Sequence, residues 1–86
     1  MKLIKTKVDM RDVIAALQEL NNDNSIPKNI REKITITSRA LMEQCELNVC
    51  VDKAMQQIDE IADEVNLNAY TRTQIWNISS MLEKLL

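Results

Sequence analysis

The sequence predicts an all-α fold: one domain, residues 1–86, that forms an antiparallel four-helix bundle. Hydrophobic residues make up 45% of the chain but aromatic residues only 2%, so the core must be aliphatic, which suits interdigitated helices. Apolar residues also recur at helical spacing in four segments, at about 8–21, 27–46, 49–65 and 69–85. Because the connections between these segments are short, consecutive helices are expected to be antiparallel neighbours.

The first helix, over residues 8–21, is indicated by an apolar stripe and by residues that can cap its start. The stripe consists of Met10, Val13, Ile14, Leu17 and Leu20. Asp9 or Thr6 can accept hydrogen bonds from the first free amide groups. The helix ends in the segment Asn21 to Asn24. Because the chain has no glycine, we expect asparagine, which tolerates left-handed backbone, to end the helix.

The second helix, over residues 27–46, is indicated by Pro27, the only proline of the chain. Proline is favoured in the first turn of a helix because its missing amide would have no partner there. Asp23, Asn24 or Ser25 is expected to supply the cap. The apolar stripe that follows consists of Ile30, Ile34, Thr37, Leu41 and Cys45.

The third and fourth helices, over residues 49–65 and 69–85, repeat the helical pattern. We expect Asn48 to cap the third helix. Its stripe consists of Val51, Ala54, Met55, Ile58, Ile61, Ala62 and Val65. Residues 66–68 separate it from the fourth helix, whose stripe consists of Ile75, Ile78, Leu82 and Leu85.

The two halves of the chain share this pattern at an offset of 41 residues, which aligns Arg31 with Arg72 and Asp23 with Glu64. We interpret the chain as two similar helical hairpins that bury their apolar faces against each other. Both hairpin turns then lie at one end of the bundle. The amino ends of the second and fourth helices are expected to open there side by side, with Arg31 and Arg72 about one turn inside them.

Two segments, DNSIPKNIREKI and DEIADEVNLNAYTRTQIWNISSMLEKL, carry a resemblance to a known family. Over nearly its whole length the chain resembles a small archaeal family known only as an uncharacterised (UPF) family, which pairs a Ser-Val-Pro-Arg-Asn-Ile-Arg turn with a later Arg-Thr-x-Ile-Trp. The matching residues here are Ser25, Pro27, Asn29, Ile30, Arg31, Arg72, Thr73, Ile75, Trp76, Leu82 and Glu83. The resemblance implies a four-helix bundle in an archaeal cytoplasm, and it implies no activity. Around the second turn, where relatives usually have prolines and a histidine, this chain has Asn66-Leu67-Asn68-Ala69-Tyr70.

The charge and hydropathy of the chain disfavour nucleic acids and membranes as partners. Eleven basic and 13 acidic residues give a net charge of -2, which is not the basic footprint of a nucleic-acid-binding domain. No apolar stretch of about 18 residues occurs, and no signal-peptide apolar run follows the lysines of MKLIKTKV. We therefore expect a cytoplasmic protein.

Cys45 and Cys50 are the only cysteines, and the chain has no histidine, so it cannot assemble a four-ligand zinc site by itself. We expect both cysteines to be buried or half-buried reduced thiols, because free cysteine prefers protein interiors. A redox pair is the alternative. The acidic residues of the third helix lack the loop spacing of calcium sites, and we expect no metal and no cofactor.

Lys28, Arg31 and Arg72 are the candidate anion contacts, because free amide groups and the helix dipole attract negative charge at helix amino ends. The alternative, which we favour, is structural. In that interpretation Asp23 and Glu64 hold the two arginines as ties across each hairpin.

Trp76 is the candidate partner contact, because it lies about 100° around the fourth helix from the apolar stripe. It either anchors a partner, as tryptophan often does at interfaces, or covers the bundle seam beneath Leu3 and Ile4, the interpretation that we favour. Ile36 and Met42 also lie off the stripe of their helix, which indicates either a wide seam or a dimer surface.

We expect no enzyme, because the chain has no histidine to activate its hydroxyl groups and no carboxylate on an apolar stripe where burial would raise its pKa. The favoured function is a non-enzymatic cytosolic interaction module that binds an unknown protein partner or a second copy of itself. The alternative is an accessory nucleic-acid or anion-binding protein that uses the paired helix amino ends.

Overall fold

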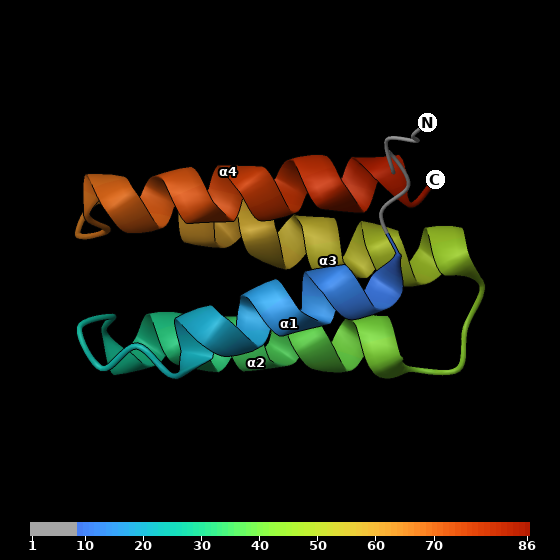
Figure 1. Ribbon diagram of the computed structural model, residues 1–86, viewed down its shortest axis with the longest axis horizontal. Coiled ribbons are helices and arrows are strands. Elements are labelled where there is room, and N and C mark those ends of the chain that lie inside the picture. The colour runs from blue at the N-terminus through green and yellow to red at the C-terminus, as the bar shows by residue number, and fades with distance from the viewer. Residues whose placement is uncertain (1–8) are drawn as a thin grey trace, which may run out of the picture.

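The computed structural model describes residues 9–86, which form four α-helices. They are α1 (Met10–Asn21), α2 (Lys28–Met42), α3 (Leu47–Ala62) and α4 (Ala69–Lys84). Successive helices run in opposite directions along the long axis of the molecule (Figure 1). The turns from α1 to α2 and from α3 to α4 lie at one end, and the connection from α2 to α3 lies at the other. The predicted all-α, four-helix domain is confirmed.

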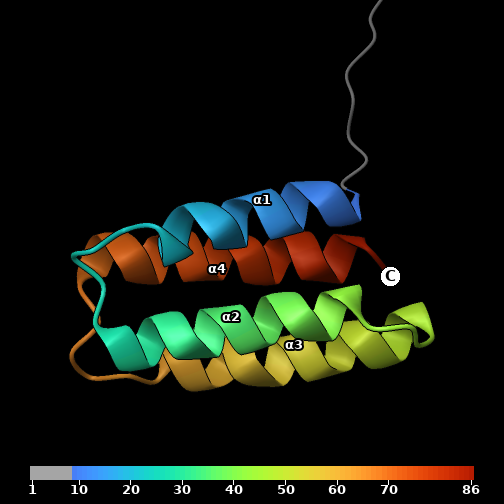
Figure 2. The same cartoon turned by 90° about the horizontal axis from the view of Figure 1, so that it is seen from below.

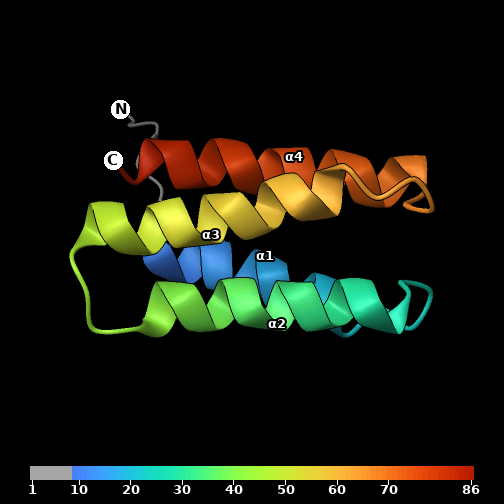
Figure 3. The ribbon, with the colours of Figure 1, turned by 180° about the vertical axis from the view of Figure 1, so that it is seen from behind.

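The helices form a ring in which each one packs against two neighbours. Seen from below, α1 lies beside α4 and α2 beside α3 (Figure 2), whereas the view from behind pairs α3 with α4 and α1 with α2 (Figure 3). The seam between α2 and α3 is the most extensive, and within residues 9–86 α2 and α4 make no contact. The amino ends of α2 and α4 therefore lie at one end of the bundle but on opposite corners. The expectation that they open side by side is wrong.

Aliphatic side chains fill the interior of the ring. The large side chains with almost no exposure are Leu17, Ile26, Ile30, Ile34, Ile58, Ile61, Ile75, Ile78 and Leu82. Two of them agree with the similarity between the two halves of the sequence. Ile34 and Ile75, which align at the 41-residue offset, are both fully buried in the core. Truncating a buried isoleucine or leucine to alanine costs about 2 to 5 kcal/mol of stability, so this layer fixes the positions of the four helices.

The start of α1 is capped by a reciprocal pair of aspartates. The amide of Asp12 donates to Oδ1 of Asp9 over 3.1 Å, and the amide of Asp9 donates to Oδ2 of Asp12 over 3.2 Å. Of the two predicted caps, Asp9 is therefore confirmed, while Thr6 lies outside the described residues. At the other end Asn22 has φ of -88°, and no residue of 9–86 has a positive φ, so the expected left-handed asparagine is wrong.

The start of α2 differs from the prediction. Pro27 itself is the cap residue, and among the described residues no side chain caps this helix. Oδ1 of Asp23 accepts instead from the amide of Ser25 over 2.9 Å and from its hydroxyl over 2.6 Å. These bonds stabilise the turn that precedes the helix, because a short acidic side chain can bond the backbone two residues on. The prediction that Asp23, Asn24 or Ser25 caps α2 is therefore wrong.

The connection from α2 to α3 also corrects the predicted boundaries 27–46 and 49–65. Helix α2 ends at Met42, because Glu43 is extended with ψ of 153°, and α3 already begins at Leu47 with Glu46 as its cap residue. Asn48 thus lies inside the first turn of α3 and is not its cap. Helix α3 ends at Ala62, so Val65 is 89% exposed and not part of the buried stripe.

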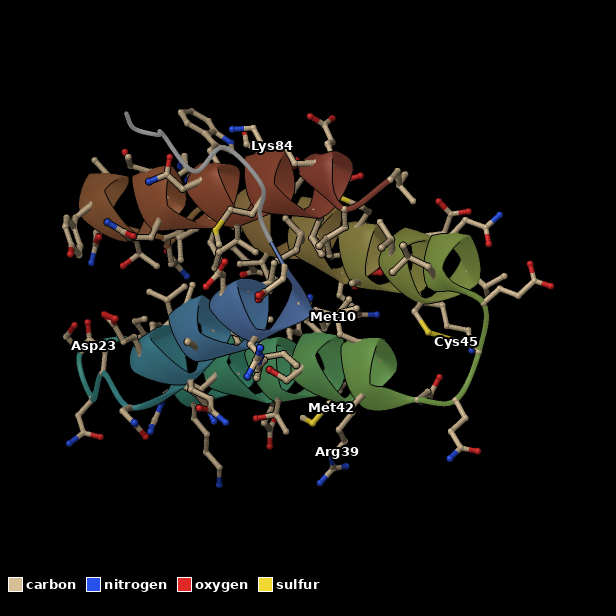
Figure 4. All side chains as sticks on the ribbon, turned by 45° about the vertical axis from the view of Figure 1, so that its right-hand side comes forward. Met10, Asp23, Arg39, Met42, Cys45 and Lys84 are labelled. Carbon is tan, nitrogen blue, oxygen red and sulfur yellow. A yellow bond between two sulfur atoms is a disulfide. The ribbon has the colours of Figure 1, made fainter. Side chains whose placement is uncertain are left out.

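Cys45 and Cys50 form a disulfide, with their Cα atoms 6.1 Å apart (Figure 4). The expectation of two reduced thiols is wrong. In a continuous helix two residues with this separation lie too far apart to bond, at about 8 Å between Cα atoms. The early end of α2 leaves Cys45 in the bend between the two helices, from which it reaches Cys50 in the first turn of α3. The bond fastens the connection to the helix that follows.

Candidate functional site

Arg72 lies near the amino end of α4, and its guanidinium group bonds the carboxyl end of α3. It donates to the backbone carbonyl oxygens of Ala62, of Glu64 over 2.9 Å and of Leu67 over 3.4 Å. The last carbonyl groups of a helix have no partner within the helix, and a cationic side chain there satisfies them and offsets the helix dipole. Arg72 therefore ties α4 to the end of α3.

Arg31 occupies the equivalent place near the amino end of α2. Its Nε donates to the carbonyl oxygen of Ile26 over 3.1 Å, five residues before it, as Leu67 is five residues before Arg72. The acids do not hold the arginines as predicted: Asp23 accepts hydrogen bonds from Ser25, and Oε2 of Glu64 lies 3.7 Å from Nζ of Lys33. The predicted ties across the turns thus use backbone carbonyl groups and not the side chains of Asp23 and Glu64.

Lys28, Arg31 and Arg72 do not form one anion site, because α2 and α4 occupy opposite corners of the bundle (Figures 1 and 2). The terminal nitrogens of Arg72 and Nε of Arg31 also already donate to carbonyl groups. A hollow of about 190 Å³ does exist between α1 and α4 at this end, but its charged lining residues are Glu19 and Asp23. Two carboxylates disfavour an anion there.

Trp76 lies on the outside of α4 and is 58% exposed. The predicted packing beneath Leu3 and Ile4 involves residues outside those described. Ile36 and Met42 belong to α2, at the opposite corner, so these two side chains and Trp76 cannot form one surface. Arg39 and Met42 project from α2 on the side of the bundle away from Lys84 of α4 (Figure 4).

A stripe of mostly charged residues, with Ile36 halfway along its length, runs along the exposed side of α2 as far as Glu43, the residue after the helix; we call it the outer face of α2. It consists of Lys28, Glu32, Thr35, Ile36, Arg39 and Glu43. At 100° per residue these positions lie within an arc of about 100° on the helix. Ile36 is 48% exposed, although its neighbours on the buried side, Ile34 and Thr37, are completely buried.

Two hollows adjoin Ile36 on this face. One, of about 360 Å³, lies between α2 and α3, and its lining includes Arg39 and Gln57 as well as Ile36. The other, of about 380 Å³, is lined by Glu32, Thr35, Ile36 and Arg39. The sequence had indicated only that Ile36 lies off the buried stripe. The hollows could not be foreseen, because they depend on where the side chains of α3 lie.

Most charges of the outer face of α2 form no ion pair with another residue of 9–86. Among residues 9–86, ion pairs join Lys33 to Glu60 and Glu64, and Lys53 to Glu43. Lys28, Glu32 and Arg39 take part in none of them. The face thus offers both signs of charge around an exposed aliphatic side chain, so charges of either sign on another surface could be matched there.

The described chain offers little for chemistry on a substrate. The buried polar residues are Thr37, Ser38 and Thr71. Thr37 donates its hydroxyl to the carbonyl oxygen of Lys33 over 2.8 Å, inside its own helix. In the part of the chain that the structure describes, no three acidic, cysteine or histidine residues lie together as a metal site would need. None of the helices within 9–86 combines the length and the apolar character that a membrane span requires.

Comparison with known proteins identifies the family to which the chain belongs. The model of a family described as "Uncharacterised protein family (UPF0147)" matches residues 1–85. A UPF0147 protein of Sulfurisphaera tokodaii is 34% identical over 82 residues, which are 94% of this chain and 92% of the relative. A UPF0147 protein of Methanocaldococcus jannaschii is 34% identical over 76 residues, 87% of this chain and 82% of the relative.

A solved structure is similar over almost the whole molecule. The crystal structure of a protein of unknown function, MMP1188, has a TM-score of 0.85 and 33% sequence identity, and the match covers 92% of this chain and 96% of that one. Together with the family match, this likeness confirms the resemblance seen in the sequence. The chain belongs to the UPF0147 family, whose relatives named above are archaeal and uncharacterised.

Proposed function

We propose that this member of the UPF0147 family is a non-enzymatic interaction module that binds another helical protein surface through the outer face of α2. The observation that carries the proposal is Ile36, a large aliphatic side chain that is 48% exposed beside two hollows and among charged side chains of both signs. Burying such a side chain removes apolar surface from water, at about 25 cal/mol for each Å². The surrounding charges would orient the partner.

The composition of the chain supports binding over catalysis. General acid–base catalysis and the activation of a nucleophile most often use a histidine within hydrogen-bonding distance of the reacting group. This chain has no histidine. The buried hydroxyl of Thr37 already bonds the backbone of its own helix. A cytosolic location would suit such a module and belongs to the same proposal.

Nucleic acid or another anion is the weaker candidate partner. The net charge of -2 repels a phosphate backbone, and Arg72 gives its donors to the end of α3. Trp76 is a second candidate protein contact, because it is 58% exposed on α4. None of the three hollows described above is lined by Trp76. The outer face of α2 combines more of the features of an interface.

Photo-crosslinking in the source cells tests the proposal. A photoreactive benzoylphenylalanine replaces Ile36 in one variant and Trp76 in a second, which serves as the comparison because Trp76 is somewhat more exposed, at 58% against 48%, and lies on the opposite corner of the bundle. We expect discrete crosslinked species from position 36, identified by mass spectrometry, and few from position 76. Equal crosslinking at both positions, or none at position 36, would contradict the proposal.

A further inference from the structure

We infer that the partner of the outer face of α2 is a second copy of this chain, with the two α2 helices antiparallel about a twofold axis that passes between Thr35 and Ile36. The inference rests on the proposed use of this face for binding. It specifies the partner, the direction of the helices and the register between them.

The order of charges along α2 carries the inference. Glu32 and Arg39 are equally far from the point between Thr35 and Ile36, and so are Lys28 and Glu43. In a twofold interface, residue i of one copy meets residue j of the other and residue j meets residue i. An antiparallel pair about this point therefore sets Glu32 opposite Arg39, and Lys28 opposite Glu43, twice each.

The same charges disfavour the other symmetric arrangement. If the two helices ran parallel, each residue would face its own copy, and Glu32 would meet Glu32 while Arg39 met Arg39. Like charges set opposite each other across an interface cost affinity and exclude that pairing. The antiparallel register turns every one of these contacts into an attraction.

The shape of the face agrees with this register. Ile36 stands beside the axis, opposite Thr35 of the second copy, so both isoleucines lie halfway along the interface, where the residues that contribute most to binding tend to cluster. The shallow, open hollow that Glu32, Thr35, Ile36 and Arg39 line lies at the same level of α2, against which the second copy's isoleucine would pack. Oε1 of Glu43 lies 3.2 Å from Nζ of Lys53 in the same chain. Lys28 of the second copy would join this ion pair and make it a network of three charges.

Charge reversal on the purified full-length protein tests the register. Glu32→Arg alone and Arg39→Glu alone each create two like-charge contacts, and we expect each to weaken the dimer by about tenfold or more. The doubly reversed chain, with both changes, should dimerise as the original does. A mixture of the two singly reversed chains should form a heterodimer, because every contact between them is again an attraction.

Sedimentation equilibrium measures these affinities, and circular dichroism checks that each variant is folded. Glu83→Arg, which reverses an exposed charge on α4, is the matched control and should leave the dimer unchanged. An original chain that stays monomeric at high micromolar concentration would overturn the inference. So would an unchanged dimer affinity in both singly reversed variants. Crosslinks from position 36 to a different protein, with a monomeric purified chain, would overturn this inference and leave the proposed function standing.

Discussion

The guanidinium group of Arg72 donates a hydrogen bond of 2.9 Å to the backbone carbonyl oxygen of Glu64, two residues beyond the last residue of α3. Arg72 thereby joins the start of one helix to the end of the preceding one. Its two further acceptors are the carbonyl oxygen of Ala62, the last residue of α3, and that of Leu67 in the turn. A single side chain thus holds the turn from α3 to α4 closed.

We expect Arg72→Ala to lower the free energy of unfolding by about 1 to 3 kcal/mol, the range for losing charged hydrogen bonds. Arg72→Lys should restore only part of this, because an ammonium group cannot reproduce the planar fork of donors. Arg31→Ala is the matched comparison and should cost less, since Arg31 bonds one carbonyl oxygen. Urea unfolding measures all three, and equal stability of the Arg72→Ala variant and the original chain would refute the structural role.

Asn68 caps α4 by accepting a hydrogen bond of 2.8 Å from the amide of Thr71. We expect Asn68→Ala to lower the free energy of unfolding by about 1 kcal/mol, the usual cost of removing a cap. Asn48→Ala is the control, because Asn48 lies inside the first turn of α3 and should change stability little. Thermal unfolding of the two variants would show the difference, and a greater loss for Asn48→Ala would contradict the cap assignment.

Hydrogen bonds from the side chain and then the backbone of Ser25 hold the pKa of the Asp23 carboxyl below its ordinary value of 3.8, with a smaller contribution from the charge of Arg31. Because the folded-state pKa is the lower one, the stability that these bonds contribute is present above pH 3.8 and is lost as the pH falls through the folded-state pKa. We expect Ser25→Ala to raise the pKa of Asp23 and to reduce this loss. Carboxyl carbon chemical shifts from NMR, recorded against pH, give the pKa directly, and an unchanged value in the variant would show that Ser25 is not its cause.

The disulfide between Cys45 and Cys50 closes a short loop, so it removes little conformational freedom from the unfolded chain. On loop length alone we expect its reduction to lower the free energy of unfolding by about 2 kcal/mol. Urea unfolding with and without a reductant measures the effect. The Cys45→Ser variant is the control: it should match the reduced chain and be insensitive to reductant, and a reductant effect on that variant would mean that another process is being measured.

The helices were predictable from the sequence because the apolar stripes have a clear helical period. Ile58 and Ile61 of α3 and Ile75 and Ile78 of α4 are all buried where the spacing placed them. The ends were less predictable. Pro27 and Glu46 begin helices without a capping side chain, so the residue types that usually mark a start, such as Asn48, pointed to wrong positions.

The sites were predictable only in part. The type of a residue does not specify which group accepts its hydrogen bonds or at which corner of the bundle its helix lies. The equivalence of Arg31 and Arg72 was visible in the sequence, but their carbonyl partners depend on how each turn folds. The ring order of the helices, which separates Trp76 from Ile36, depends on side-chain packing around the whole core. The alternating charges around Ile36 were present in the sequence, yet they become meaningful only once α2 is known to expose that side.

The unequal seams of the ring imply an order of opening. Helices α2 and α3 share the most extensive seam and are joined by the connection that the disulfide fastens, whereas α1 and α4 share the least extensive one. Parts of a protein with few packing contacts open at a low free energy, and well-packed parts open only at a free energy near that of global unfolding. Amide protons in the middle of α3 should therefore exchange with solvent only through global unfolding. Those of α1 and α4 should exchange through partial opening, in which the seam between these two helices separates while α2 and α3 stay paired.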